Sequence, residues 1–264
     1  MNRQAAIAFV NVRGSPTEQA RLRYLLDGEH PTPEVVHQLL AGQREDGGWS
    51  PFWATDYSSL DATCFRLAKA EQLGLAANET AIRLALAFLA HRLRDDGSWE
   101  EEEHVAALAP PWATPGNLAS RLYLTANCGF WLAAFAETSE NAHQAATYLQ
   151  AHLNDDDHLP TFLHAHWLAG GLWYRLHWQT EAKRIFNYLQ RQLPALPASN
   201  LAWLMTTLLL AGAPTTEPLI EQAASLLAQS QEEDGRWPSE GGSERDVHAT
   251  LEAMRALRLC GYLV

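Results

Sequence analysis

Apolar and polar positions along the chain alternate between two kinds of helical segment. Five segments are amphipathic, each with one polar face: 34–43, 80–93, 141–153, 181–193 and 217–231. The segments that follow them are apolar on nearly all sides: 58–73, 116–136, 161–177, 199–211 and 245–259, with 17–26 as a sixth. A helix that is apolar all round must be buried on all sides, whereas an amphipathic helix covers a core. The pattern therefore predicts an all-α protein with an inner and an outer layer of helices.

Three loops between these helices share one sequence template. They are residues 43–49 (QREDGGW), 93–99 (LRDDGSW) and 231–237 (QEEDGRW). The interval between the second and third loops is close to three times that between the first two, so two degenerate loops are expected at 154–160 and 193–197. In each loop we expect Asp to accept backbone N–H groups, Gly to allow a tight turn and Trp to cover it.

The repeats account for nearly the whole chain. At about 45 residues for each helix pair, little is left for a second domain. We therefore predict one domain over residues 1–264, an α/α toroid of about six helix pairs arranged as two concentric rings. An open solenoid uses the same repeats and is the alternative.

Composition and charge exclude several classes of protein. With 47% hydrophobic residues, a chain of 264 residues can bury a sizeable core. The formal net charge of -12 opposes binding to nucleic acid or to an anionic membrane. Three Cys without metal-type spacing argue against a disulfide framework and favour the cytoplasm. We also expect no signal peptide and no membrane span.

A Gln-x-x-Asp-Gly-x-Trp loop followed by a helical Thr about fourteen residues later resembles the QW repeat of squalene–hopene cyclases, class II diterpene cyclases and prenyltransferase β subunits. The match is clear over 43–63 and 231–259, partial over 93–99, where Leu93 replaces Gln, and rests on spacing alone in between. The resemblance implies a toroid whose central cavity holds an isoprenoid or a similar apolar molecule. Fold membership does not establish a reaction, however.

Both catalytic motifs of the resembling families are missing or displaced. The Asp-x-Asp-Asp acid motif is absent, and the Asp run 155–157 lies in a predicted loop, where we expect it to be solvated. Against the prenyltransferase zinc pattern, Cys64 comes one place late after Asp61, and His248 comes one place early after Asp246. One position on a helix turns a side chain by about 100°. We therefore predict no metal site and no Zn²⁺. Binding of Mg²⁺ is an option if the substrate is a diphosphate, and diphosphate–magnesium binding is the alternative role of the Asp run.

Polar residues near the starts of the inner helices are the candidate catalytic groups. Asp61 and His248 each stand two places before the repeat Thr and form the leading acid–base pair. Asp246 and His166 are further candidates. Alternatively, the Asp residues cap helices and the His residues bond to backbone groups. Of His164 and His166, at most one faces the cavity, because their side chains diverge by about 200°.

Aromatic and cationic residues on the inner helices are the candidate substrate-binding groups. Aromatic rings stabilise carbocations, and guanidinium groups bind phosphate, whereas core packing and ion pairs are the alternatives for the same residues. The set is Trp53, Tyr57, Trp112, Asn117, Arg121, His164, Trp167 and Trp203. The segment from Glu100 to Trp112 lengthens one post-loop connection and either forms a lid or, from its four consecutive Glu, a solvated surface run.

Three functions remain open at this stage. The first is a small stand-alone terpene cyclase-like enzyme that acts on an isoprenoid or similar apolar substrate by general acid–base chemistry. The second is a non-catalytic toroid that binds an apolar small molecule or a protein partner. The third, an α/α-barrel carbohydrate enzyme, needs two cavity carboxylates, and the Asp-Gly-x-Trp loops argue against it. The oligomeric state is not indicated.

Overall fold

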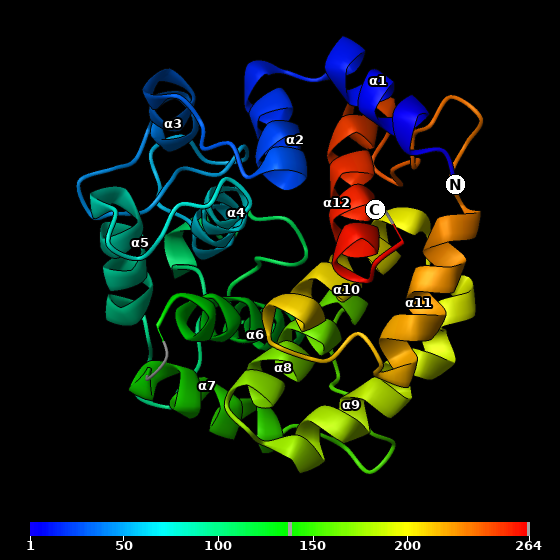
Figure 1. The fold of residues 1–264 in the computed structure, drawn as a ribbon. Coiled ribbons are helices and arrows are strands. Elements are labelled where there is room, and N and C mark those ends of the chain that lie inside the picture. The colour runs from blue at the N-terminus through cyan, green and yellow to red at the C-terminus, as the bar shows by residue number, and fades with distance from the viewer. Residues whose placement is uncertain (137–138, 263–264) are drawn as a thin grey trace. The chain divides into compact units, whose positions relative to one another are not determined.

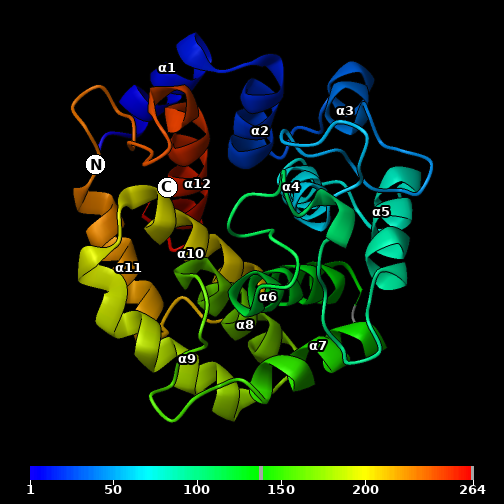
Figure 2. The same cartoon turned by 180° about the vertical axis from the view of Figure 1, so that it is seen from behind.

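The computed structural model describes residues 1–136 and 139–262, and over these residues it contains helices and no β-strand (Figure 1 and Figure 2). The all-α prediction is confirmed. The helices are α1 (Arg3–Arg13), α2 (Pro16–Asp27), α3 (Pro33–Leu40), α4 (Leu60–Glu71), α5 (Thr80–His91), η1 (Glu103–Val105), α6 (Leu118–Phe135), α7 (Glu140–Gln150), α8 (Leu163–Arg175), α9 (Gln179–Gln192), η2 (Leu193–Ala195), α10 (Ala198–Leu210), α11 (Pro218–Gln229), η3 (Ser243–Arg245) and α12 (Asp246–Leu259).

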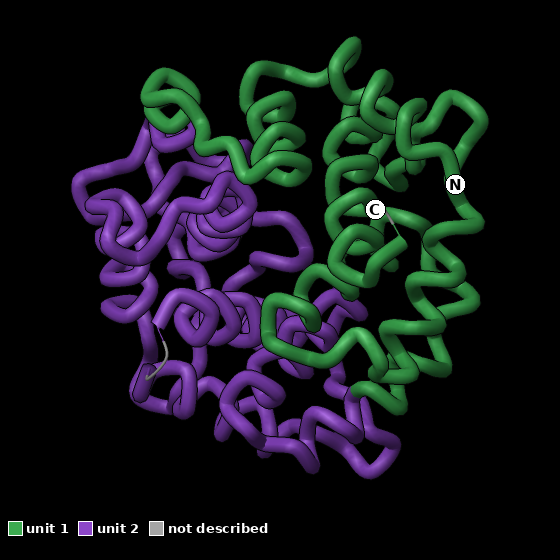
Figure 3. The backbone as a smooth tube through the Cα atoms, viewed as in Figure 1, with its two compact units in different colours: residues 1–38, 186–264 green, residues 39–185 purple. Residues whose placement is uncertain are grey.

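Two compact units make up the chain (Figure 3). We call residues 39–185 the middle unit, and residues 1–38 together with 186–264 the terminal unit. In the middle unit α6 packs between α4 and α8, while α5 covers the α4–α6 joint and α7 covers the α6–α8 joint. In the terminal unit α12 packs between α10 and α2, with α11 and α1 as the covering helices. The predicted alternation of inner and outer helices therefore holds within each unit.

Helix α6 shows why the inner helices are apolar all round. Every side chain from Leu122 to Ala133 is buried, because α4, α5, α7 and α8 all pack against this helix. Helix α9, by contrast, buries one stripe that includes Ile185 and Leu189 and exposes the opposite face. Burial on all sides against burial on one side is the distinction that the hydrophobic pattern predicts.

Each of the three repeat loops ends in a Trp that is almost completely buried and that donates both of its N–H groups. The backbone N–H donates to a Thr hydroxyl in the next helix, at 3.2 Å for Trp49–Thr63, 3.0 Å for Trp99–Thr125 and 3.0 Å for Trp237–Thr250. The indole N–H donates to a carbonyl near the end of the preceding helix, that of Leu40, Leu89 or Leu227. A single residue thus joins an outer helix to the inner helix that follows it.

The degenerate loop expected at 154–160 is present and keeps the same architecture with different residues. Asp157 takes the positive φ that Gly has in the other loops, 66°. Leu159 replaces Trp and is fully buried. Its backbone N–H donates to Nε2 of His166 at 3.1 Å, in place of the Thr hydroxyl. The loop needs an acceptor at this point, since a buried N–H without a partner is costly.

The glycine of the third loop lies against α1, and its substitution tests the close packing. We expect Gly235→Ala to lower the free energy of unfolding by clearly more than Gly212→Ala. Both have left-handed backbones, with φ of 91° and 93°, so both lose about 1–2 kcal/mol. A Cβ on Gly235 would also lie 2.3 Å from the carbonyl carbon of Ala5, whereas one on Gly212 meets nothing within 4 Å. Urea unfolding measures both losses, and equal losses would contradict the close approach.

Candidate functional site

Asp61 lies in the first turn of α4 but does not cap that helix. Ser59 is the N-cap, and its hydroxyl accepts a backbone N–H of the first turn at 3.2 Å. The Asp61 carboxylate instead accepts three side-chain donors, the Tyr123 hydroxyl at 2.8 Å, the Trp112 indole N–H at 3.1 Å and the Asn127 amide at 3.4 Å. Two donors come from α6 and one from the segment before it. Ser59 therefore caps α4, which was the alternative role considered for Asp61.

Burial dominates the electrostatics of Asp61. It raises the pKa of the carboxyl group, and the hydrogen bonds from Tyr123, Trp112 and Asn127 oppose that rise. Burial likewise raises the pKa of Tyr123 and of the two free thiols Cys64 and Cys128, whose Sγ atoms lie 3.8 Å apart. The result is a carboxyl group that burial biases toward its protonated form, with three donors ready to stabilise the carboxylate. Such a group can hold a proton and deliver it.

Glu101 is a buried carboxylate near Asp61, 3% exposed, and sequence reasoning missed it. It accepts the Ser59 hydroxyl at 2.6 Å, the Tyr57 hydroxyl at 2.8 Å and the Leu60 N–H at 3.0 Å. Burial raises the pKa of Glu101, while these hydrogen bonds oppose the rise. Glu101 thus anchors the N-terminus of α4, and Tyr57, a predicted substrate-binding residue, belongs to that anchor.

The interpretation of the four-Glu run as a solvated surface is wrong for its first two members. The Glu100 side chain is 6% exposed and binds Arg121, whose Nη2 lies 3.1 Å from each carboxylate oxygen. Glu100 and Glu101 directly follow the buried Trp99, whereas Glu102 and Glu103 are exposed. Arg121 therefore forms the ion pair named above as the alternative to phosphate binding. Asn117, another predicted residue, is the N-cap of α6.

His248 belongs to a polar cluster inside the terminal unit that the sequence did not reveal. Its Nδ1 lies 3.1 Å from Arg21 of α2, and Arg21 also pairs with Glu252 at 3.1 Å. Glu252 accepts the Thr206 hydroxyl of α10 at 3.2 Å. Because a guanidinium group only donates, Nδ1 must be the acceptor and the neutral ring carries its proton on Nε2. Arg21 is 3% exposed and is therefore a buried cation between α2, α10 and α12 side chains.

Asp246 has a local role at the start of α12. Its Oδ1 accepts the Ser239 backbone N–H at 2.8 Å, and its Oδ2 lies 3.6 Å from Nε of Arg236. These contacts hold the segment that follows the Trp237 loop. Asp246 and His248 belong to the terminal unit, and Asp61 belongs to the middle unit.

His166 is buried, and its ring nitrogens face backbone groups. Nε2 accepts from Leu159, and Nδ1 lies 3.2 Å from the carbonyl oxygens of Phe162 and Leu163. Burial lowers the pKa of His166 to about 4, so the ring is neutral at neutral pH. His166 thus takes the structural place of the repeat Thr.

The remaining predicted residues are spread over both units. His164 packs edge-on to the fully buried Trp167, with ring centroids 5.1 Å apart. Trp53 lies 6.0 Å from the Tyr57 ring, and Trp203 is half-buried on α10. Of the predicted set, the structure brings Trp112 into direct contact with Asp61.

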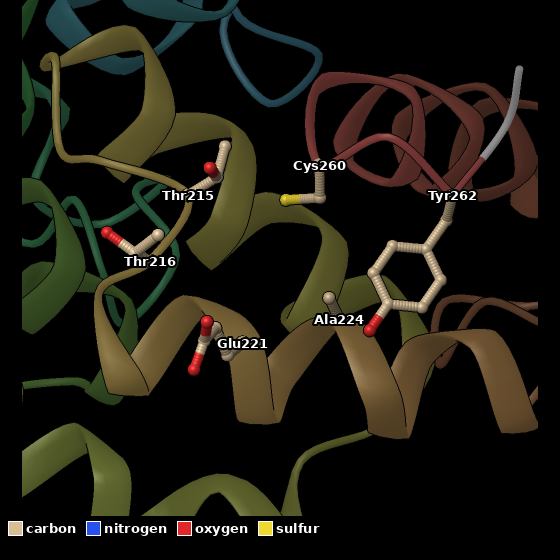
Figure 4. A pocket seen from close by; sticks show the side chains of 6 residues that line it. All are labelled: Thr215, Thr216, Glu221, Ala224, Cys260 and Tyr262. Atoms are coloured by element: carbon tan, nitrogen blue, oxygen red, sulfur yellow. The ribbon is translucent and has the colours of Figure 1, made fainter.

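A surface hollow of about 390 Å³ lies in the terminal unit, away from every predicted residue. Figure 4 shows Cys260 and Tyr262, which follow the end of α12, facing α11 and the loop before it. The lining residues are Thr215, Thr216, Glu221, Ala224, Cys260 and Tyr262. Three hydroxyl groups and a carboxylate in the wall suit a polar occupant rather than an apolar one.

Within 1–136 and 139–262, no three His, Cys, Asp or Glu side chains converge in a way that could hold a metal ion. No helix in the same ranges has both the length and the apolar character needed to cross a bilayer.

Comparison with known proteins identifies the fold. No family model matches the sequence, and no curated protein matches it. Solved structures match over nearly the full length: the apo type II terpene cyclase MstE from Scytonema has a TM-score of 0.63 at 15% identity, covering 99% of this chain and 98% of that one. An MstE variant in complex with merosterolic acid A (product) gives 0.64 at 16% identity, over 99% and 96%. A protein from Actinoplanes gives 0.58 at 16% identity, over 98% of each chain.

The chain has the terpene cyclase-like fold. Identities of 15–16% establish no more than this architecture, so the reaction has to be argued from the side chains.

The raised pKa of Asp61 makes the stability difference between wild type and Asp61→Asn depend on pH. The folded state holds this proton more tightly than the unfolded chain, whose pKa is near 3.8. The stabilisation is complete below that value and is lost as pH rises through the folded pKa. We therefore expect Asp61→Asn to gain stability relative to wild type as pH rises, in urea unfolding at a series of pH values. Asp155→Asn, in an exposed loop, is the control. A difference for Asp61→Asn that does not vary with pH would contradict the shift.

Proposed function

We propose that this protein is a small stand-alone terpene cyclase-like enzyme in which Asp61 protonates an apolar isoprenoid substrate. The observation that carries the proposal is the state of Asp61, a carboxyl group that burial biases toward protonation and that three neutral donors surround. A general acid needs both properties, since it must hold its proton before the reaction and stabilise the charge afterwards. The terpene cyclase-like fold supports the same assignment.

The proposed step is a simple proton transfer. The π electrons of a substrate alkene form a new C–H bond with the Asp61 proton, which leaves a carbocation on the neighbouring carbon. The O–H bonding pair stays on the Asp61 carboxylate, where the donors from Tyr123, Trp112 and Asn127 stabilise it. A second alkene of the same chain then attacks the carbocation and closes a ring, which moves the positive charge onto that alkene. Loss of a proton from a neighbouring carbon to water forms a new double bond and discharges the cation, and Asp61 takes up a proton from water before the next cycle. Aromatic rings near a developing cation favour this course.

His248, Asp246 and His166 take no proton in this proposal. Arg21 occupies Nδ1 of His248, so the neutral ring presents Nε2–H, which is a donor rather than a base. Asp246 holds a backbone N–H, and both nitrogens of His166 face backbone groups. Asp61 therefore carries the acid role without the histidine partner that the sequence suggested.

The substrate class follows from the structural neighbours and is part of the proposal. Structures of MstE variants contain geranylgeranyl dihydroxybenzoate as substrate and merosterolic acid A as product. We accordingly propose a polyprenyl chain, either free or attached to an aromatic acid. Proton transfer from Asp61 needs no cofactor, and Mg²⁺ enters only if the substrate is a diphosphate.

Turnover of polyprenyl compounds tests the acid role directly. We expect purified wild type to cyclise at least one of geranylgeranyl diphosphate, a geranylgeranyl dihydroxybenzoate and squalene, in the presence or absence of Mg²⁺. Asp61→Asn is expected to lower kcat by about 10²–10⁴-fold, because it removes the general acid. Product formation by mass spectrometry is the measurement, and Asp155→Asn in the exposed loop 154–160 is the control.

Two other results of this experiment would change the proposal. Full activity of Asp61→Asn would remove the acid role from this residue. Wild type that binds these compounds without converting any of them would instead favour the non-catalytic binding protein.

A further inference from the structure

The segment 100–116, which we call the insertion, distinguishes the second repeat from the others. The loop Trp and the Thr that it bonds are separated by 26 residues in this repeat, against 14 and 13 in the first and third. The Trp99–Thr125 hydrogen bond is kept at 3.0 Å despite the added length. The insertion therefore lengthens the connection to α6 without changing the hydrogen bond that links the loop to this helix.

Carboxylate contacts close the insertion on itself. Glu100 at its start accepts the Gly116 backbone N–H at its end, at 2.5 Å, and binds Arg121 in the first turn of α6. Midway along it, the Pro111 carbonyl accepts the Ser120 hydroxyl at 2.7 Å. The residue next to Trp112 is thus tied directly to α6.

The same segment holds the start of α4. Glu101 accepts the Ser59 hydroxyl and the Leu60 N–H, and its Oε1 lies 3.4 Å from the Asp61 backbone nitrogen. Trp112 donates to the Asp61 side chain at 3.1 Å. The insertion therefore positions both Asp61 and one of its hydrogen-bond donors.

The donors divide unequally between the two carboxylate oxygens of Asp61. Tyr123 and Asn127 both donate to Oδ1, and among the described residues Trp112 alone donates to Oδ2. Asn127 also donates to the Tyr123 oxygen at 3.4 Å, which turns the phenol proton toward Asp61. Each carboxylate oxygen has two lone pairs, so Oδ1 is saturated and Oδ2 keeps one free. The acid proton belongs on Oδ2, the atom that Trp112 contacts.

We propose that the insertion tunes Asp61 through Trp112: the transferable proton sits on Oδ2, and the indole N–H stabilises the charge left there. This inference rests on the proposed function. In the step, the Oδ2–H bond breaks, its proton goes to an alkene carbon, and its electron pair stays on Oδ2. Trp112 needs no movement at that moment, because the contacts of Glu100 and Ser120 already hold it in place. Glu100 and Glu101 are positioning residues.

Few charged groups near Asp61 could mask the effect of Trp112 on the pKa of its carboxyl group. The titratable groups in electrostatic contact with it are Tyr123 and Cys128 on α6 and Cys64 on α4, and burial keeps all three pKa values raised. The nearby Glu101 carboxylate bonds to Tyr57, which in turn accepts from Arg92 at the end of α5. A change at Trp112 leaves all of these groups in place.

The test is the pKa of the Asp61 carboxyl group, read from the carboxyl carbon signal of ¹³C-labelled aspartate in NMR titrations. We expect Trp112→Phe, which keeps the ring but loses the N–H, to raise this pKa. Glu100→Gln, which weakens the closure of the insertion, should raise it less, and this variant serves if Trp112→Phe does not fold. Trp178→Phe, at a half-buried Trp between α8 and α9, is the matched control and should leave the pKa unchanged.

Kinetics supply the second readout. If the protein turns over a polyprenyl substrate, Trp112→Phe should lower kcat by about 10–100-fold with KM little changed, since a hydrogen bond to a charged group contributes about 1.5–3 kcal/mol. An Asp61 pKa that is unchanged or lowered in Trp112→Phe would overturn the inference. Absence of turnover in wild type with the pKa rise present would overturn the proposed function and not the tuning by Trp112.

Discussion

A buried backbone N–H at the end of each repeat loop must find a hydrogen-bond acceptor, and the architecture is organised around that requirement. In three loops the acceptor is a Thr hydroxyl of the next inner helix, and the neighbouring indole N–H bonds back to the preceding outer helix. The fourth loop has Leu159 in place of Trp and solves the same problem with Nε2 of His166. Any acceptor that satisfies the buried N–H removes the cost of leaving it unpaired. The accepting residue can therefore change from Thr to His while the hydrogen bond between the loop and the next helix is kept.

This joint allows the second repeat to accommodate the insertion. Trp99 and Thr125 meet at the usual distance although many more residues separate them, so the helices do not depend on what the insertion contains. The added chain provides Glu100 and Glu101, which are structural, and Trp112, which reaches Asp61. Because the hydrogen bond between the loop and α6 does not depend on the insertion, the insertion can hold Trp112 against Asp61 without disturbing the helices.

Glu101 and Asp61, two desolvated carboxylates of the middle unit, meet the cost of desolvation in different ways. Glu101 accepts backbone and hydroxyl donors at the start of α4, so protonating it would weaken the helix that carries Asp61. Asp61 accepts side-chain donors alone, from α6 and the insertion. Gain or loss of its proton therefore changes side-chain contacts and leaves the backbone bonds intact, which is the difference between a structural carboxylate and one that can exchange a proton.

The sequence by itself determined the helical fold and the inner or outer layer of the helices within each unit, and it predicted Asp61 and Trp112 as site residues. These features depend on local periodicity and on turn residues, which are properties of neighbouring positions. Only the tertiary structure decided that Glu101 is buried, that Arg121 pairs with Glu100, that His166 replaces a Thr, and that Arg21 and Glu252 meet beside His248. Each of these depends on which side chains from distant segments pack together, and a charged residue reads the same in sequence whether its partner is water or a buried group of opposite charge.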